Sequence, residues 1–120
     1  MIPFISIITV SYNSESTIRK TIESIINQTF QNFEYIIIDG QSTDKTNKII
    51  DEYKIILKDK LIHISEPDQG IYDAMNKGID LASGDFAIFM NSNDEFYDNT
   101  ILEKVVNKIN HKNKVYFGRA

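Results

Sequence analysis

The sequence predicts an α/β fold in which a doubly wound, mostly parallel sheet carries helices on both faces. Apolar runs of strand length alternate along the chain with segments whose apolar residues recur at helical spacing. The strand-like runs are largely apolar, as in central strands that are buried on both faces, and do not strictly alternate with polar residues. Right-handed crossovers between the strands follow from the handedness of βαβ units.

The first two βα units occupy residues 5–57. Residues 5–10 form an apolar strand, and Ser14 or Ser16 is a candidate N-cap for the helix that follows. Residues 35–38 form the second strand, which leads into a polar turn over residues 39–44. The apolar stripes of the two helices are Ile18, Ile22, Ile25 and Ile26 in the first, and Ile49, Ile50, Tyr53, Ile56 and Leu57 in the second.

The remaining units follow the same period. Residues 61–65 and 86–90 form strands, and Ser83-Gly84 ends the helix between them. The apolar stripe of that helix is Tyr72, Met75, Ile79 and Ala82, and that of the next helix is Ile101, Leu102, Val105, Val106 and Ile109. We expect Tyr53, Tyr72 and Met75 to pack in the core. A last strand, 115–117, follows the turn at 111–113. We interpret residues 1–120 as one unit cut from a larger domain.

Composition narrows the class of protein. A chain of 120 residues has the length of one domain. Its 13 Lys and Arg against 17 Asp and Glu give a net charge of −4 without a basic block, which argues against a nucleic-acid partner. The chain has no cysteine, and no apolar run approaches the ~20 residues of a transmembrane helix. We expect a cytoplasmic protein, and peripheral attachment to a membrane stays open.

Polar residues follow four of the predicted strands, at the edge where ligands bind to open parallel sheets. These strand ends are residues 11–13, residues 39–44, Glu66 with Asp68, and residues 91–94. Carboxylates at three of them, Asp39, Asp68 and Asp94, would repel one another and favour a cation or a hydrogen-bond donor between them.

Asp94 is the candidate metal ligand, because a carboxylate just past a buried strand can bind Mg²⁺ or Mn²⁺ while substrate phosphates complete the shell. The alternative is that Asp94 caps a turn. The loop 11–16 has no glycine-rich phosphate signature, so the helix that begins near Gly70 is a second candidate for holding phosphate. Asp39 is a candidate to bind a nucleobase or ribose, because a carboxylate accepts hydrogen bonds from N–H and O–H groups. The alternative is that Asp39 only forms an Asx-turn.

Five segments, in order, resemble glycosyltransferases of family 2. They are 6–13 (SIITVSYN), 24–30 (SIINQTF), 37–44 (IIDGQSTD), 66–79 (EPDQGIYDAMNKGI) and 84–94 (GDFAIFMNSND), and together they span most of the chain. The resemblance implies the GT-A fold, which is Rossmann-like, and a nucleotide-diphosphate sugar as donor.

The same resemblance assigns roles to individual residues. It implies a nucleobase pocket lined by Val10, Ser11 and Tyr12, a base contact from Asp39, and contacts to sugar and diphosphate from Asp68 and Gly70. Asn93 and Asp94 fall on the family's metal motif, with Asp94 as ligand to Mg²⁺ or Mn²⁺. The sequence departs from the family at residues 91–94, where two or more carboxylates are common, and at Gly40, where many members have another Asp. Asp73 and Asn76 could be site residues or could satisfy nearby backbone.

We therefore expect an inverting, metal-dependent transfer of sugar to a hydroxyl of a glycan or a lipid-linked acceptor, in polysaccharide or glycan biosynthesis. Inversion needs a carboxylate, the general base, to deprotonate the acceptor. The resemblance implies that this base lies beyond Ala120, so none of residues 1–120 is assigned as catalytic, and we expect this chain to be inactive alone. Donor sugar, nucleobase and oligomeric state are left open.

Three other functions are alternatives. A receiver-like signalling module needs an acidic pair after the first strand, and Ser11-Tyr12-Asn13 does not supply one. A nucleotidyltransferase needs a Gly- and Arg/Lys-rich loop there, which residues 14–16 are not. A chain that binds a nucleotide without transferring sugar is the third alternative.

Overall fold

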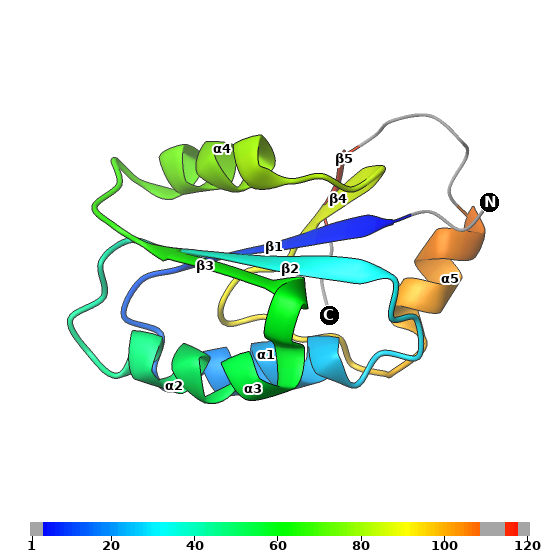
Figure 1. The fold of residues 1–120 in the computed structure, drawn as a ribbon, viewed down its shortest axis with the longest axis horizontal. Helices are drawn as coiled ribbons and strands as arrows, with labels where there is room; N and C mark the ends of the chain where they lie inside the picture. Colours follow the sequence, from blue (N-terminus) through cyan, green and yellow to red (C-terminus); the bar gives the residue numbers. More distant parts are fainter. Residues whose placement is uncertain (1–3, 109–114, 118–120) are drawn as a thin grey trace.

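A computed structural model describes residues 4–108 and 115–117. Within them, five parallel strands form one sheet in the order β3-β2-β1-β4-β5 (Figure 1). The strands are β1 (Ile5–Ser11), β2 (Phe33–Asp39), β3 (Leu61–Ser65), β4 (Phe86–Phe89) and β5 (Val115–Phe117). The chain builds outward from β1 to β3 and then returns to the other side of β1, so strand order reverses between β1 and β4. The predicted parallel sheet is confirmed.

Helices lie on both faces of the sheet, as predicted. They are α1 (Ile18–Ile26), α2 (Thr46–Glu52), α3 (Lys54–Leu57), the 3₁₀ helix η1 (Lys58–Lys60), α4 (Ile71–Leu81) and α5 (Ile101–Lys108). Helices α1, α2 and α3 cover one face, and α4 covers the other (Figure 1).

Three of the sequence predictions lie outside the described residues. They are the inclusion of Ile109 in the last apolar stripe, the turn at 111–113, and the placement of the general base beyond Ala120. Ala120 itself is the last residue of the chain and is not described. The position of the base therefore stays a prediction.

The predicted apolar stripe after the second strand is partly wrong. Tyr53 and Leu57 are buried as expected, but Ile56 is 60% exposed. The helix is interrupted at Tyr53, whose N–H bonds to the carbonyl of Ile50, three residues back. A tighter turn of this 3₁₀ type changes the rotation between successive residues, so Ile56 leaves the buried stripe.

The predicted N-cap of α1 is also wrong. The helix begins after Thr17, and neither Ser14 nor Ser16 caps it with a side chain. The Ser14 carbonyl accepts the N–H groups of Thr17 and Ile18, while its hydroxyl lies 2.7 Å from the hydroxyl of Ser92. Ser14 therefore joins the start of α1 to the loop after β4.

Helix α4 packs against the sheet through small residues. Ala74 and Gly78 are buried, whereas Tyr72 is 79% exposed, so the prediction that Tyr72 packs in the core is wrong. A Cβ atom on Gly78 would lie 2.5 Å from Cγ2 of Ile8, because the helix lies very close to β1. Large residues at helical spacing cannot fill so narrow a gap. Met75 does pack against this core, as expected.

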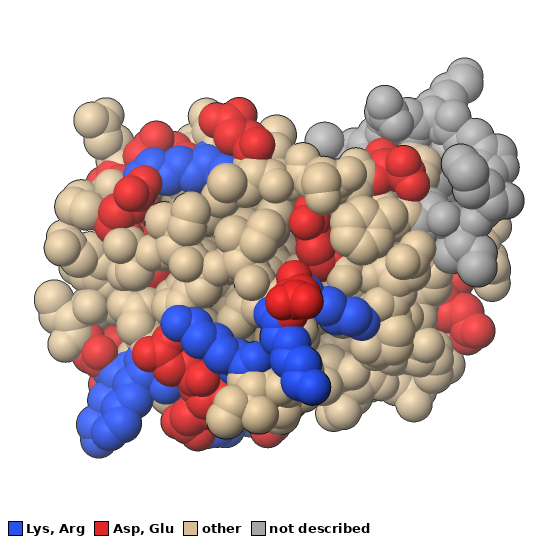
Figure 2. Space-filling view, in the orientation of Figure 1, with Lys and Arg blue, Asp and Glu red and all other residues tan. Residues whose placement is uncertain are grey.

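Positive and negative side chains are mixed on the face shown in Figure 2. Lysine and arginine side chains gather near α2 and α3, and carboxylates lie among them. Ion pairs in this region join Lys54 to Asp51 (2.7 Å) and Arg19 to Glu52 (3.2 Å). These pairs are exposed and contribute little to stability.

Candidate nucleotide site

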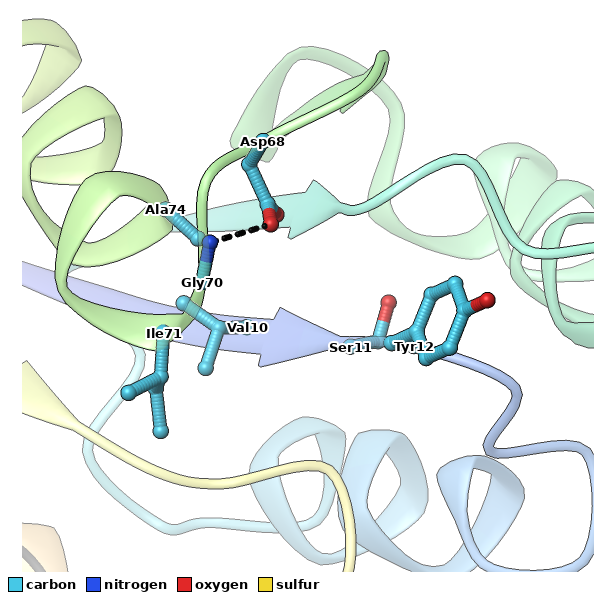
Figure 3. Close-up of a pocket in the computed structure, with 7 residues that line it drawn as sticks. All are labelled: Val10, Ser11, Tyr12, Asp68, Gly70, Ile71 and Ala74. Carbon is cyan, nitrogen blue, oxygen red and sulfur yellow. Dashed lines mark hydrogen bonds between the residues drawn. The ribbon is translucent and has the colours of Figure 1, made fainter.

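The carboxyl end of β1 opens into a pocket that we call the strand-end pocket. It has a volume of about 160 Å³. Its lining residues are Val10, Ser11, Tyr12, Asp68, Gly70, Ile71 and Ala74 (Figure 3). A second hollow, the loop pocket, has a volume of about 430 Å³ and shares Tyr12 and Asp68 with the first. Its other lining residues are Gly40, Gln41, Thr43 and Pro67.

The structure thus brings together five of the residues expected to bind nucleotide: Val10, Ser11, Tyr12, Asp68 and Gly70. They come from β1 with the loop after it and from the loop before α4, two segments that are far apart in sequence. Asp39, Asn93 and Asp94 line neither pocket. Tyr12 is 63% exposed, so its ring is available to a ligand at the junction of the two pockets.

Asp39 is fully buried and is held by donors from the ends of three strands and from α2. Its Oδ1 accepts the hydroxyls of Ser11 (2.7 Å) and Ser42 (2.5 Å). Its Oδ2 accepts the N–H of Ser42 (2.7 Å), the hydroxyl of Ser65 (2.9 Å) and the amide of Asn47 (3.1 Å). Burial raises the pKa of Asp39, but the hydrogen bonds outweigh it and leave the pKa below its ordinary value. Asp39 is therefore an ionised residue that joins β1, β2 and β3.

Asn47 extends this network to a histidine. While its amide nitrogen donates to Asp39, its Oδ1 lies 2.9 Å from Nε2 of His63. Burial and the nearby charge of Lys54 lower the pKa of His63. The imidazole is thus neutral at pH 7 and donates to Asn47 through Nε2. Sequence analysis missed both residues, because neither belongs to a recognisable motif and only the fold brings them to Asp39.

Gly40 makes room for the carboxylate of Asp68. A Cβ atom at position 40 would lie 2.8 Å from Oδ2 of Asp68. The other oxygen of that carboxylate accepts the N–H of Gly70 at 3.0 Å (Figure 3). The sequence departs from the family pattern at Gly40, and the structure shows what accompanies this difference. The carboxylate of Asp68 fills the space that a larger residue at position 40 would need.

We expect Gly40→Ala to displace the Asp68 carboxylate and to weaken nucleotide binding by about tenfold, since one charge-assisted hydrogen bond is lost or misdirected. Calorimetry with a nucleoside diphosphate would measure the change. Gly84→Ala is not a suitable control, because its Cβ would meet backbone atoms at 2.7 Å. Ser83→Ala, at the opposite end of the sheet, is better and should leave affinity unchanged. Unaltered binding by Gly40→Ala would contradict the prediction.

Helix α4 begins at Ile71, as the expected phosphate site near Gly70 requires, and Gly70 is its N-cap with φ 113°. Two carboxylates already occupy this end. Asp68 accepts the N–H of Gly70, and Asp73 accepts the N–H of Gln69 at 3.0 Å. They partly offset the positive end of the helix dipole. Lys77 pairs with Asp73 (3.6 Å) and offsets part of this negative charge, and a further cation would favour a diphosphate here.

Asp94 lies in the loop after β4. Its backbone N–H bonds to the carbonyl of Asn91 (3.0 Å), whereas its carboxylate, half-buried, bonds to none of residues 4–108. The part of the chain that the structure describes contains no group of three metal-binding side chains. One unengaged carboxylate fits Mg²⁺ or Mn²⁺ as a single ligand, with phosphate and water oxygens as the others. Asn93 is exposed beside it.

A doubly wound parallel sheet with a pocket at the carboxyl end of β1, beside the point where strand order reverses, defines the class of open α/β domains that bind ligands at this edge. The particular family follows from sequence comparison. The model of "Glycosyl transferase family 2" matches residues 6–120, and the chain belongs to that family. Within the described residues, none of the helices has the length and apolar character to cross a membrane.

Individual relatives agree with this assignment. A "PGL/p-HBAD biosynthesis glycosyltransferase" of Mycobacterium tuberculosis is 38% identical over 103 residues, which are 86% of this chain and 40% of the relative. S. aureus TarS 1-349, in complex with UDP-GlcNAc, matches with a TM-score of 0.78 and 27% identity over 87% of this chain and 30% of the TarS 1-349 chain.

A mannosyltransferase of Pyrobaculum calidifontis, in complex with GDP-Man and Mn²⁺, matches with a TM-score of 0.79 and 20% identity over 89% of this chain and 31% of its own. These neighbours are GT-A glycosyltransferases, so the fold is GT-A. The chain spans about 40% of the length of the mycobacterial relative.

Proposed function

We propose that this chain is the donor-binding part of a glycosyltransferase that moves sugar from a nucleotide-diphosphate sugar to a hydroxyl of a glycan or lipid-linked acceptor. The observation that carries the proposal is the convergence of Val10, Ser11, Tyr12, Asp68 and Gly70 on one pocket at the switch point. The proposed setting is cytoplasmic glycan or polysaccharide biosynthesis. The TarS complex with UDP-GlcNAc, on the same fold, supports this class of donor.

The nucleoside would occupy the strand-end pocket and extend into the loop pocket. Apolar atoms of Val10 and Ile71 and the exposed ring of Tyr12 suit the faces of a base. Ser11 lines the same pocket and donates its hydroxyl to Asp39. Asp39 thus influences the pocket through Ser11, and a direct bond to the base would require the base to replace one of the donors that now surround the carboxylate.

The diphosphate would lie between α4 and the loop after β4, with Asn93 nearby. Asp94 would hold Mg²⁺ or Mn²⁺, and the cation would neutralise charge on the departing nucleoside diphosphate. We propose an inverting displacement, in which the acceptor oxygen attacks the anomeric carbon as that diphosphate leaves. The base that takes the acceptor proton is proposed to belong to a part of the protein beyond Ala120.

Nucleotide binding should depend on a divalent cation. We expect a nucleoside diphosphate to bind at least about tenfold more tightly with Mn²⁺ or Mg²⁺ than in EDTA, because Asp68, Asp73 and Asp94 otherwise repel the phosphates. Calorimetry with UDP and GDP would measure this and would show whether either nucleobase is preferred. The matching nucleoside without phosphates is the control, since its affinity should not respond to metal. Equal affinity of the diphosphate in both conditions would refute the metal site.

A further inference from the structure

One face of α1 is polar and bonds to the loop that carries Asp94. Thr21, Ser24 and Gln28 are spaced by three and four residues, so they share a face of this helix and its C-terminal extension. Thr21 is fully buried and Gln28 is 3% exposed. Polar side chains at such positions need partners, and the loop after β4 provides them.

Thr21 contacts the backbone of Asp94 itself. Its hydroxyl donates to the main-chain oxygen of Asp94 at 2.5 Å and lies 3.0 Å from that of Ser92. The hydroxyl of Ser92 in turn lies 2.7 Å from that of Ser14. The backbone at Ser92, on the N-terminal side of Asp94, is therefore held both from the loop after β1 and from α1, and Thr21 also holds the carbonyl of Asp94 itself.

Ser24 and Gln28 fix the other side of Asp94. The hydroxyl of Ser24 accepts the N–H of Phe96 at 3.0 Å. The amide of Gln28 donates to the carbonyl of Asp98 (2.8 Å), and its oxygen accepts the N–H of Leu102 (3.0 Å). One helix face thus bonds to the loop at intervals from Ser92 to the first turn of α5.

The backbone of Asp94 is therefore held in place, while its carboxylate has no hydrogen-bond partner among residues 4–108. The hydroxyl of Thr21 bonds to the carbonyl of Asp94, which we assign as the metal ligand, and also to that of Ser92 two residues earlier, so it holds the backbone on both sides of Asp94. Groups that orient a metal ligand commonly change metal affinity by about 10- to 100-fold when they are removed.

We propose that Thr21 is a positioning residue for Asp94, and that its hydroxyl sets the direction in which this carboxylate meets the cation of a bound nucleoside diphosphate. The inference rests on the proposed function. Ser24 supports the same loop from the other side of Asp94, at a greater distance along the chain.

The test compares Thr21→Val, which keeps the shape and removes the hydroxyl, with Thr21→Ser, which restores the hydroxyl. The readout is the affinity for Mn²⁺ in the presence of saturating UDP or GDP, whichever the wild type binds. We expect Thr21→Val to weaken Mn²⁺ binding by about tenfold and Thr21→Ser to stay within about twofold of wild type. Binding of the phosphate-free nucleoside should not change in either variant.

Two further variants separate the possible outcomes. Thr29→Val is the matched control, because the exposed Thr29 hydroxyl bonds to none of the described residues, and it should behave as wild type. Asp94→Asn reports on the proposed function. If wild type and Asp94→Asn bind Mn²⁺ equally, the proposed metal site fails. If Asp94→Asn weakens Mn²⁺ binding but Thr21→Val does not, the positioning role of Thr21 is overturned.

A parallel loss of nucleoside affinity in Thr21→Val would also overturn the inference, since it would show a general structural defect. If Thr21→Val does not fold, Ser24→Ala takes its place, because it removes the acceptor for the N–H of Phe96 two residues beyond Asp94. Weaker Mn²⁺ binding with unchanged nucleoside binding would then support the role of this helix face, and unchanged Mn²⁺ binding would overturn it.

Discussion

Asp94→Asn is expected to lower the rate of sugar transfer by the complete enzyme about 10²- to 10³-fold, as when one group that stabilises developing charge is removed. The substitution keeps the size of the side chain and removes the negative charge that would hold the cation. A loss of this size corresponds to ~3 to 4 kcal/mol in the activation free energy. Initial rates with a nucleotide-sugar donor, measured over a range of Mn²⁺ concentrations, would show it.

The matched control is Asp80→Asn, an exposed carboxylate on α4 that bonds to none of the described residues. It should keep the wild-type rate. The expected Asp94→Asn defect is in kcat and in the Mn²⁺ concentration that gives half the maximal rate. A variant that stays within about threefold of wild type at every Mn²⁺ concentration would show that Asp94 is not the metal ligand.

Asp39→Ala is expected to lower the free energy of unfolding by about 2 kcal/mol, because the buried hydroxyl of Ser11 loses its acceptor and the ends of β1, β2 and β3 lose the carboxylate that joins them. Denaturant unfolding would measure the loss. The matched control is Asp59→Ala, an exposed Asp in η1 that bonds to none of the described residues, and it should change stability by less than about 0.5 kcal/mol.

The Asp39 effect should depend on pH in a defined direction. Because the folded-state pKa lies below the ordinary value of 3.8, the carboxylate contributes stability in full above that value. The contribution is lost as the pH falls through the folded-state pKa. The stability difference between wild type and Asp39→Ala should therefore be constant near neutral pH and should shrink below pH 3.8. A difference that grows on acidification would contradict this account.

Asp39→Asn tests the proposed role in nucleotide binding separately from stability. It keeps the shape of the side chain and removes the charge, and we expect affinity for the nucleoside to fall by roughly ten- to a hundredfold. Binding must be compared at a temperature where both proteins are folded. A folded variant with normal affinity would mean that Asp39 only organises the strand ends.

Much of the fold could be predicted because it depends on local periodicity. The largely apolar runs at residues 5–10 and 35–38 became β1 and β2 of a parallel sheet, and helices cover both faces. The errors arose where close packing decides which residue is buried. Gly78 rather than Tyr72 faces the sheet, because α4 lies against Ile8 at a distance that only a small residue allows.

The candidate site, like the fold, could be predicted only in part. Strand ends with polar residues indicated a candidate edge for ligand binding, and Val10, Ser11, Tyr12, Asp68 and Gly70 do meet in one pocket there. The sequence could not indicate that both carboxylate oxygens of Asp39 already accept hydrogen bonds. The donors come from separate segments, namely Ser11, Ser42, Asn47 and Ser65. Bonds between distant segments leave no local pattern.

The class of fold, the family and the candidate edge of the sheet could be read from periodicity and short motifs, because these are local features of the chain. Which groups are available at that edge depends on how distant segments pack together. The tertiary structure buries Asp39 among donors, places Asp68 against Gly40, and holds the backbone of Asp94 from Thr21 while its carboxylate keeps no partner in residues 4–108. The burial and the hydrogen-bond partners of a side chain depend on segments that meet only in the folded protein. A polar residue can therefore be recognised from the sequence, but whether it is free to bind a metal or a substrate cannot.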